Sequence, residues 1–244
     1  MTLSFIKPPE HPPLNVLLYG APKTGKTAGA CSAPPGVLLL NLDLPNATHF
    51  ALSQHPDGSI MVANFEGLQT MIDVSHAIIE QRGQAEPVIR TVVIDTVAEL
   101  HRRLLEEASD RAVRPTLNQY GDTSTHIERF CRFCCEAAVN CVIVCHETPV
   151  RDEASGQFER LPYTGTTNPA LGQKLMGMVD VVGYTGVVEQ EGGTHQYVAQ
   201  LVNGLGRRGG DRFNVLGDWR PLDLSEWVRV IHEGPAPVEQ PLAA

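Results

Sequence analysis

The residues best suited to bind a ligand lie in the stretch GAPKTGKT, from Gly20 to Thr27, directly after the apolar run NVLLY. Its spacing matches the phosphate-binding loop G-x-x-x-x-G-K-[ST], in which glycines allow a tight turn and successive backbone amides point at a phosphate. The motif predicts that Lys26 reaches the β- and γ-phosphates as a point charge and that the Thr27 hydroxyl ligates Mg²⁺. The predicted nucleotide contacts are Gly20, Ala21, Pro22, Lys23, Thr24, Gly25, Lys26, Thr27 and Ala28.

Two further apolar runs end in a carboxylate. Asp95 closes the run TVVID, which fits the Mg²⁺-binding carboxylate that partners a phosphate loop, either directly or through water. Thr96 follows it, where many motor-type ATPases have Glu, so the general base must come from elsewhere. Asp43 follows the run VLLLNL and is a candidate for that base, because a carboxylate there can orient the attacking water. A solvated turn residue before Pro45 is an equally good interpretation of Asp43.

His146 and Glu147 follow a fourth apolar run, CVIVC. A polar group at this place can contact the γ-phosphate and transmit its loss to the segment 151–172, as switch loops do on hydrolysis. Glu147 is also the alternative to Asp43 as general base. The competing interpretation of His146 is a buried histidine that is satisfied by backbone partners.

Five of the six cysteines lie between Cys131 and Cys145, and Cys131 and Cys134 have the C-x-x-C spacing of many zinc ligands. However, both lie on the apolar stripe of a predicted helix, whereas Cys141 and Cys145 lie in a predicted buried strand. Free cysteine is itself a frequent core residue, so we favour reduced core thiols over a zinc site or disulfides.

The elements that must position these residues alternate along the chain. Apolar runs predict strands, and apolar residues at helical spacing predict helices between them. The predicted strands are 15–19, 37–42, 91–95 and 141–145; the predicted helices are 24–31, 67–81, about 97–112, one around 127–138, and 222–231. We predict loops at 114–123 and 151–172 and a β-hairpin around 191–193. Because the carboxyl ends of parallel strands meet at one edge, Thr27, Asp43, Asp95 and His146 are expected to face one crevice.

Length and composition favour one α/β domain with a mostly parallel sheet flanked by helices and a C-terminal β-hairpin extension. We expect an N-terminal extension over 1–13, a single domain over 14–232 and a disordered tail over 233–244. The chain has 244 residues and a net charge of -9, which argues against a uniformly basic, histone-like surface but permits a local basic groove. Neither a signal peptide nor a membrane span is predicted, so a cytoplasmic protein that contacts no membrane is expected.

The chain resembles the short phage-encoded RecA-like ATPases that act in single-strand annealing and recombination. The resemblance covers roughly residues 14–219 and rests on six stretches of sequence. They are LLYGAPKTGKT, LLLNLDLPN, TVVIDTVAEL, LNQYGDTSTHIERF, VIVCHETPV and DRFNVL. The first and third are shared with many ATPases, whereas the last three, in this order and spacing, are more specific.

The resemblance implies a RecA-like P-loop NTPase core in which the strand ending at His146 lies between the phosphate-loop strand and the Asp95 strand. It further implies ATP hydrolysis with Mg²⁺, assembly of copies into a ring or filament, and a bacterial host cell as the location. Single-stranded DNA would bind to the loops 114–123 and 151–172, which contain aromatic residues beside arginines. A single-strand-binding protein is a further candidate partner.

Two departures from the family pattern bear on activity. RecA-like proteins usually have Glu at the position that aligns with Asp43, and the shorter side chain argues against fast hydrolysis. The family tends to have Lys just before the Asp-Arg pair near the end, where this chain has Gly210. Arg212, or one of Arg207 and Arg208, can serve instead as the arginine finger toward a neighbour's nucleotide, although a solvated arginine cluster fits equally well.

The sequence leaves two functions of different classes open. The first is a DNA-dependent ATPase that coats or anneals single strands during phage DNA recombination. The second is a nucleotide-gated binding module with little turnover that recruits a protein partner. A small-molecule phosphotransferase is disfavoured because the chain has no separate acceptor-binding domain or arginine-rich lid.

Overall fold

A ten-stranded sheet runs through the described residues of the structure, a computed structural model that describes residues 11–42, 49–53, 55, 57–109, 114–151, 156–190 and 192–234. The strands are β1 (Asn15–Gly20), β2 (Val37–Asn41), β3 (Ile60–Asn64), β4 (Thr91–Asp95), β5 (Asn140–Arg151), β6 (Phe158–Tyr163), β7 (Val181–Glu189), β8 (His195–Gln200), β9 (Gly210–Asp211) and β10 (Trp219–Pro221). Their order is β10-β8-β7-β1-β5-β4-β2-β3, with β6 beside β5 and β9 beside β7.

The six strands from β7 to β3 in this order are mutually parallel, and β6, β8, β9 and β10 pair antiparallel to their neighbours. The predicted fold class is confirmed: a mostly parallel α/β sheet carries a C-terminal β-hairpin, β7 with β8. β5, which contains His146, lies between β1 and β4. This is the strand order that the resemblance to RecA-like ATPases implies.

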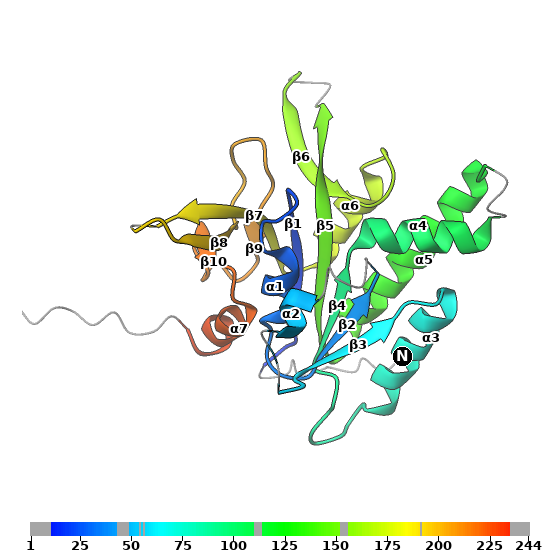
Figure 1. Cartoon of the computed structure of the whole chain (residues 1–244), viewed down its shortest axis with the longest axis horizontal. Helices are drawn as coiled ribbons and strands as arrows, with labels where there is room; N and C mark the ends of the chain where they lie inside the picture. The colour runs from blue at the N-terminus through cyan, green and yellow to red at the C-terminus, as the bar shows by residue number, and fades with distance from the viewer. Residues whose placement is uncertain are drawn as a thin grey trace, which may run out of the picture.

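Helices cover both faces of the sheet (Figure 1). They are α1 (Lys26–Cys31), α2 (His49–Ser53), α3 (Leu68–Glu80), α4 (Val97–Ala108), α5 (Leu117–Glu136), α6 (Ala170–Met178) and α7 (Leu224–Glu233). Buried residues of α3, α4, α5 and α6 form one hydrophobic cluster with the sheet, and buried residues of α1 and α7 form another on the opposite face. The continuous apolar strands therefore result from burial on both faces.

The alternation of side chains along β1 and β5 divides the core. Leu17 and Ile143 join the α3–α6 side, whereas Leu18 and Val144 join the α1 and α7 side. Cys131 and Cys134 of α5 and Cys141 of β5 are buried in the first of these clusters, the one on the α3–α6 side. Among the described residues no cluster of three His, Cys, Asp or Glu side chains is arranged to hold a metal ion, and burial raises the pKa of the Cys131 thiol. Cys131, Cys134 and Cys141 are therefore core residues, whereas Cys135 is only partly buried.

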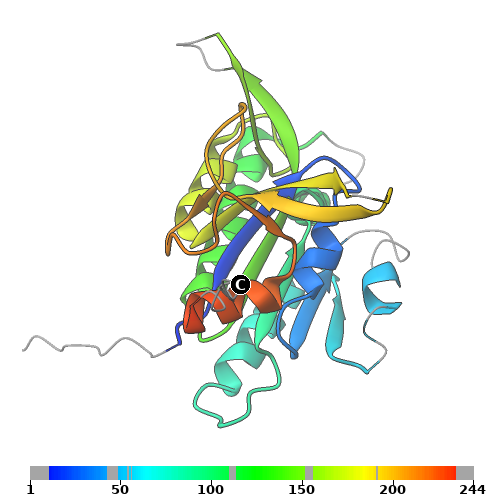
Figure 2. The same cartoon turned by 90° about the vertical axis from the view of Figure 1, so that its left-hand side faces the viewer.

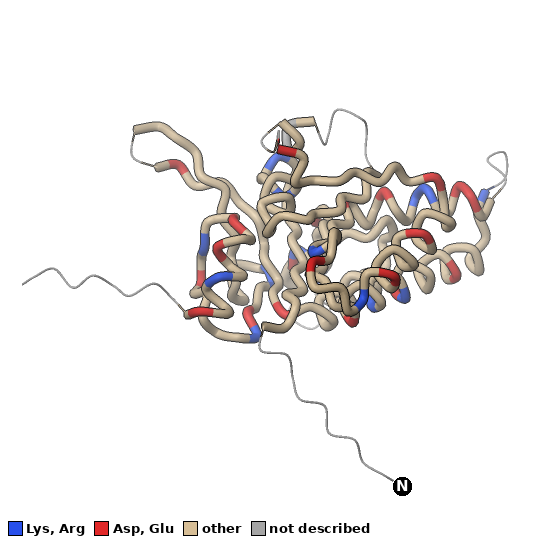
Figure 3. Tube along the Cα trace, turned by 90° about the horizontal axis from the view of Figure 1, so that it is seen from below, with Lys and Arg blue, Asp and Glu red and all other residues tan. Residues whose placement is uncertain are grey.

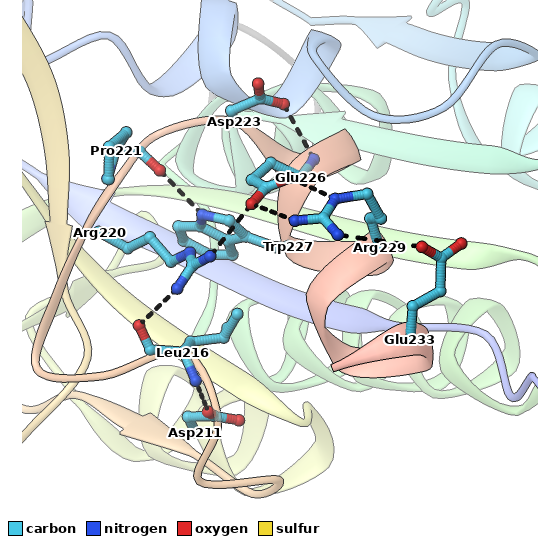
Figure 4. A network of polar contacts seen from close by, with 9 residues as sticks. All are labelled: Asp211, Leu216, Arg220, Pro221, Asp223, Glu226, Trp227, Arg229 and Glu233. Carbon is cyan, nitrogen blue, oxygen red and sulfur yellow. Dashed lines mark hydrogen bonds and ion pairs between the residues drawn. The ribbon is translucent and has the colours of Figure 1, made fainter. Parts of the chain in front are cut away.

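The last helix is fastened to the preceding loop by a polar network (Figure 4). Glu226 binds Arg229 at 2.7 Å and Arg220 at 3.2 Å, and the indole of Trp227 donates to the Pro221 carbonyl at 2.8 Å. Leu224, Trp227 and Val230 of α7 are buried, so apolar burial contributes more to the docking of this helix than the exposed ion pairs do.

Several segments differ from the sequence predictions, among them the short elements α2, β9 and β10, which were not predicted. The strand β3 was not predicted, although residues 60–63 are all apolar; it is an edge strand, and only Ile60 of its five residues is buried. The predicted loop 114–123 is wrong from Leu117 onward, because α5 begins there. Its start is a capping box in which Thr116 accepts from the Gln119 amide and the Gln119 side chain accepts from the Thr116 amide.

The predicted loop 151–172 is also wrong over most of its length. It contains β6 and the start of α6, and β5 itself continues past His146 as far as Arg151. From His146 onward β5 pairs with β6, and together they form a hairpin that projects from the body of the molecule (Figures 1 and 2). The strand is extended because the residues after His146 gain ladder hydrogen bonds from β6.

Figure 3 shows Lys and Arg interspersed with Asp and Glu along the trace of the described residues. This distribution agrees with the net charge of -9. Within the same residues, no helix combines the length and the apolarity that a membrane crossing requires.

Candidate functional site

The loop from Gly20 to Thr27 connects β1 to α1 at the carboxyl edge of the sheet. Gly25 has a φ of 79°, in the left-handed region that glycine adopts without strain. A Cβ atom at this position would lie 2.4 Å from the ring of Tyr197, so only glycine fits between the loop and β8. The backbone conformation required by the motif is therefore present in the loop.

Lys26 is buried within this loop. Its Nζ donates to the carbonyls of Gly20 at 3.1 Å and Ala21 at 2.6 Å. Burial lowers the pKa of Lys26, and the nearby carboxylates of Asp95 and Glu147 raise it and oppose that effect. The ammonium group thus lies inside the turn of the loop, where a bound phosphate would meet it.

Thr27 lies in α1, which follows β1, and Asp95 ends β4; the two residues meet although β5 lies between β1 and β4. The Thr27 hydroxyl donates to Asp95 Oδ2 at 2.5 Å. Asp95 is buried at the end of β4. Hydroxyl and carboxylate oxygens are the ligands that Mg²⁺ prefers, so the donor set of this pair fits a magnesium ion.

His146 and Glu147 lie next to the loop, because His146 is the register partner of Gly20 in the parallel pair of β5 and β1. Glu147 Oε1 accepts from the Arg160 guanidinium at 2.5 Å. The structure therefore brings Lys26, Thr27, Asp95, His146 and Glu147 to one edge of the sheet. Asp43, the other candidate base, lies outside the described residues.

A group of aromatic and arginine side chains beside Glu147 was not predicted from the sequence. Tyr19, the residue before Gly20, is fully buried, and its hydroxyl accepts from the Arg208 amide at 2.8 Å and lies 3.1 Å from the Arg160 carbonyl. Burial raises the pKa of Tyr19 to about 12. Tyrosine at the end of an otherwise apolar strand was the available signal, because a buried hydroxyl needs polar partners.

Tyr184 of β7 connects this group. Its ring contacts that of Tyr19 edge to face at 5.3 Å, and the Arg207 guanidinium lies 4.3 Å above it. Burial and then a hydrogen bond with Glu147 raise the pKa of Tyr184. Through Tyr19 and Tyr184, strand β1, which precedes the phosphate-binding loop, contacts the β5–β6 hairpin and the loop that contains Arg207.

The C-terminal hairpin also packs on the phosphate-binding loop. The hydroxyls of Thr24 and Thr185 are 2.6 Å apart, and Thr185 Oγ1 donates to the Tyr19 carbonyl at 3.3 Å. Together with Tyr197 against Gly25, these contacts hold the loop from the side of β7 and β8. No local sequence pattern identifies Thr185 or Tyr197, since each meets the loop across more than half of the chain.

The three arginines that are candidates for a finger all have partners within the chain. Arg207 stacks on Tyr184, Arg208 binds Glu159 at 2.7 Å and Arg212 binds Asp180 at 2.7 Å. Asp180 also accepts from the amide of Asn15, at the start of β1, which is about 16 Å along the strand from Gly20. Within one chain, the structure does not bring Arg212 to the phosphate-binding loop.

The two segments predicted to bind DNA contribute to one cleft. It has a volume of about 670 Å³ and lies between the first turns of α5 and the connection from β6 to α6, with Tyr120 and Tyr163 in its lining. Phe158 and Arg151, by contrast, are register partners on the β5–β6 hairpin. Tyr120 and Tyr163 are therefore brought together, whereas Phe158 and Arg151 lie on a separate projection.

The chain was compared with protein families and with known proteins. A family model described as an AAA domain matches residues 12–213. No curated protein matches the chain.

Solved structures give weaker similarities. The KaiC-like protein PH0186 from Pyrococcus horikoshii is 13% identical, with 76% of this chain and 77% of that chain covered and a TM-score of 0.45. The flagellar accessory protein FlaH from Methanocaldococcus jannaschii is 11% identical, with 87% of each chain covered and a TM-score of 0.38. The ATPase EscN of the enteropathogenic E. coli type III secretion system is 12% identical, with 71% of this chain and 43% of that chain covered and a TM-score of 0.47.

The family match contains the whole phosphate-binding loop, Asp95, His146 and Glu147, so the residues that meet at the sheet edge all lie inside it. The chain belongs to the AAA-domain family.

Proposed function

We propose that the protein is a Mg²⁺-dependent ATPase that binds single-stranded DNA and promotes phage DNA recombination or strand annealing. The observation that carries the ATPase part is the contact between Thr27 and Asp95 beside the buried Lys26. Lys26 would neutralise the phosphates, and Thr27 with Asp95 would hold the magnesium ion. Gly20 to Ala28 would enclose the nucleotide in a single domain over residues 14–232.

Glu147 and Asp43 are the proposed alternatives for orienting the attacking water. Glu147 is supported by its place beside the register partner of Gly20 and by its electrostatic effect on Lys26. The Arg160 guanidinium donates to one of its oxygens, which fixes the position of the side chain. His146 would contact the γ-phosphate, and Arg212 would act on the nucleotide of a neighbouring copy in a ring or filament.

The DNA part of the proposal is supported by the resemblance and by the cleft that Tyr120 and Tyr163 line. The link from Glu147 through Arg160 to the β5–β6 hairpin supports coupling between the two sites, because Arg160 belongs to the hairpin. Loss of the γ-phosphate would change the position of Glu147 and, through Arg160, that of the hairpin.

A binding module with little turnover remains the second candidate. It is favoured by the partners of Arg207, Arg208 and Arg212, each of which is held within its own chain. An arginine finger must be free to reach a neighbour's phosphates. In this case the nucleotide would gate binding to a protein partner.

The binding of a labelled single strand should depend on the nucleotide. We expect fluorescence anisotropy at fixed salt to give an affinity about tenfold higher with Mg²⁺ and a non-hydrolysable ATP analogue than with Mg²⁺ and ADP. Equal affinities in the two states would contradict the coupling. Nucleotide binding without any DNA binding would favour the second candidate.

A further inference from the structure

The cleft between α5 and the β6–α6 connection offers an aromatic surface that is prepared for stacking. Tyr120, on the first turn of α5, is 36% exposed and lines the cleft. The imidazole of His101, from α4, stacks on Tyr120 with a centroid distance of 6.0 Å and an angle of 25° between the rings. One side of the Tyr120 ring is thus supported by a protein ring, and the exposed part of the residue is turned to the cleft.

His101 is itself fixed. The residue is fully buried, and Ser124 Oγ lies 3.4 Å from His101 Nε2. The backbone of Gly165 packs so closely that a Cβ atom added to Gly165 would lie 2.8 Å from the Cβ atom of His101. Burial lowers the pKa of His101, which favours the neutral ring. A rigid support of this kind reduces the entropy that Tyr120 loses when a flat ligand stacks on it.

The charges in the cleft indicate which part of a ligand it suits. Lys174, its basic side chain, binds Glu128 at 2.6 Å, and both residues line the cleft. Glu128 therefore compensates the positive charge of Lys174, which disfavours the binding of a phosphate in the cleft. The remaining polar lining includes Ser124, Thr166 and Asn168, whose hydroxyl and amide groups suit the uncharged polar edge of a heteroaromatic ring.

We propose that this cleft holds a nucleobase of the bound single strand, stacked on Tyr120. The proposal rests on the proposed DNA-binding function and gives it a specific subsite. Stacking on an aromatic side chain accepts any base, because every base has a π face. The strand's phosphates would lie outside the cleft.

The test compares an oligothymidylate with an abasic oligonucleotide of the same length, so that only the bases differ. With Mg²⁺ and a non-hydrolysable ATP analogue, Tyr120→Ala is expected to weaken binding of the oligothymidylate about 5- to 150-fold. Binding of the abasic strand should be the same for the variant and the unaltered protein. Tyr120→Phe keeps the ring and should stay within about threefold of the unaltered protein.

Trp219→Ala is the matched control, because it removes an exposed aromatic side chain from β10, which does not line the cleft. It should bind both strands as the unaltered protein does, and thermal unfolding should confirm that each variant is folded. An undiminished affinity of Tyr120→Ala for oligothymidylate, or equal losses for both strands, would overturn the subsite while DNA binding stands. Failure of the unaltered protein to bind either strand would overturn the DNA function as well. Tight binding of free thymidine alone would overturn the proposal in favour of a small-molecule site.

Discussion

Replacing Lys26 by alanine is expected to lower ATP hydrolysis about 100-fold or more, because it removes the buried positive charge that would face the transferring phosphate in the proposed site. ATP affinity should fall as well. The loss of turnover should exceed that of other single substitutions in the loop, because Gly20 and Gly25 determine the backbone conformation whereas Lys26 supplies the positive charge of the loop. Steady-state turnover and equilibrium binding of a fluorescent ATP analogue measure the two losses.

The same variant needs a control for folding, because Lys26 also donates to the carbonyls of Gly20 and Ala21. Circular dichroism should show an unaltered fold, since the sheet and both hydrophobic clusters are independent of these two hydrogen bonds. Lys174→Ala removes a surface lysine from α6 and should leave DNA-independent turnover unchanged. Full activity of Lys26→Ala would exclude the loop as the nucleotide site.

The second large effect is expected for Asp95→Asn. The amide oxygen can still accept the hydrogen bond from Thr27, so the geometry of the loop is preserved. The lost carboxylate charge should weaken Mg²⁺ binding and reduce hydrolysis by about 100-fold or more, whereas nucleotide binding without Mg²⁺ persists. A titration of turnover against Mg²⁺ concentration, with nucleotide binding measured in the presence of a chelator, separates the two effects.

Thr27→Ser is the conservative partner of this experiment, because serine keeps the hydroxyl that meets Asp95. It should retain most of the turnover and the same Mg²⁺ dependence. If Asp95→Asn shows the Mg²⁺ dependence of the unaltered protein, the metal site lies elsewhere.

The parts of the fold that could be predicted are those whose signal is local. The apolar runs of β1, β2, β4 and β5 are strands buried on both faces, and the glycines and Lys26 of the loop have a fixed spacing. The start of α5 could not be separated from a loop by polarity alone, since its capping box lies in a polar stretch. Strand β3 was not predicted although residues 60–63 are all apolar, because so short a run does not by itself distinguish a strand from other structure.

The site was predictable to the same degree. Thr27 and Asp95 each follow or end a recognisable strand, so their meeting could be expected. Thr185 reaches the loop across 161 residues of sequence, and Tyr184 reaches Glu147 from another strand. Such contacts depend on the register of β7 against β1, which no pattern within either strand specifies.

The proposed DNA-dependent ATPase activity is tested by measuring ATP hydrolysis by the purified protein with Mg²⁺, with and without single-stranded DNA at one fixed salt concentration. We predict Mg²⁺-dependent turnover that rises when the single strand is added. A rate that single-stranded DNA leaves unchanged would contradict this prediction.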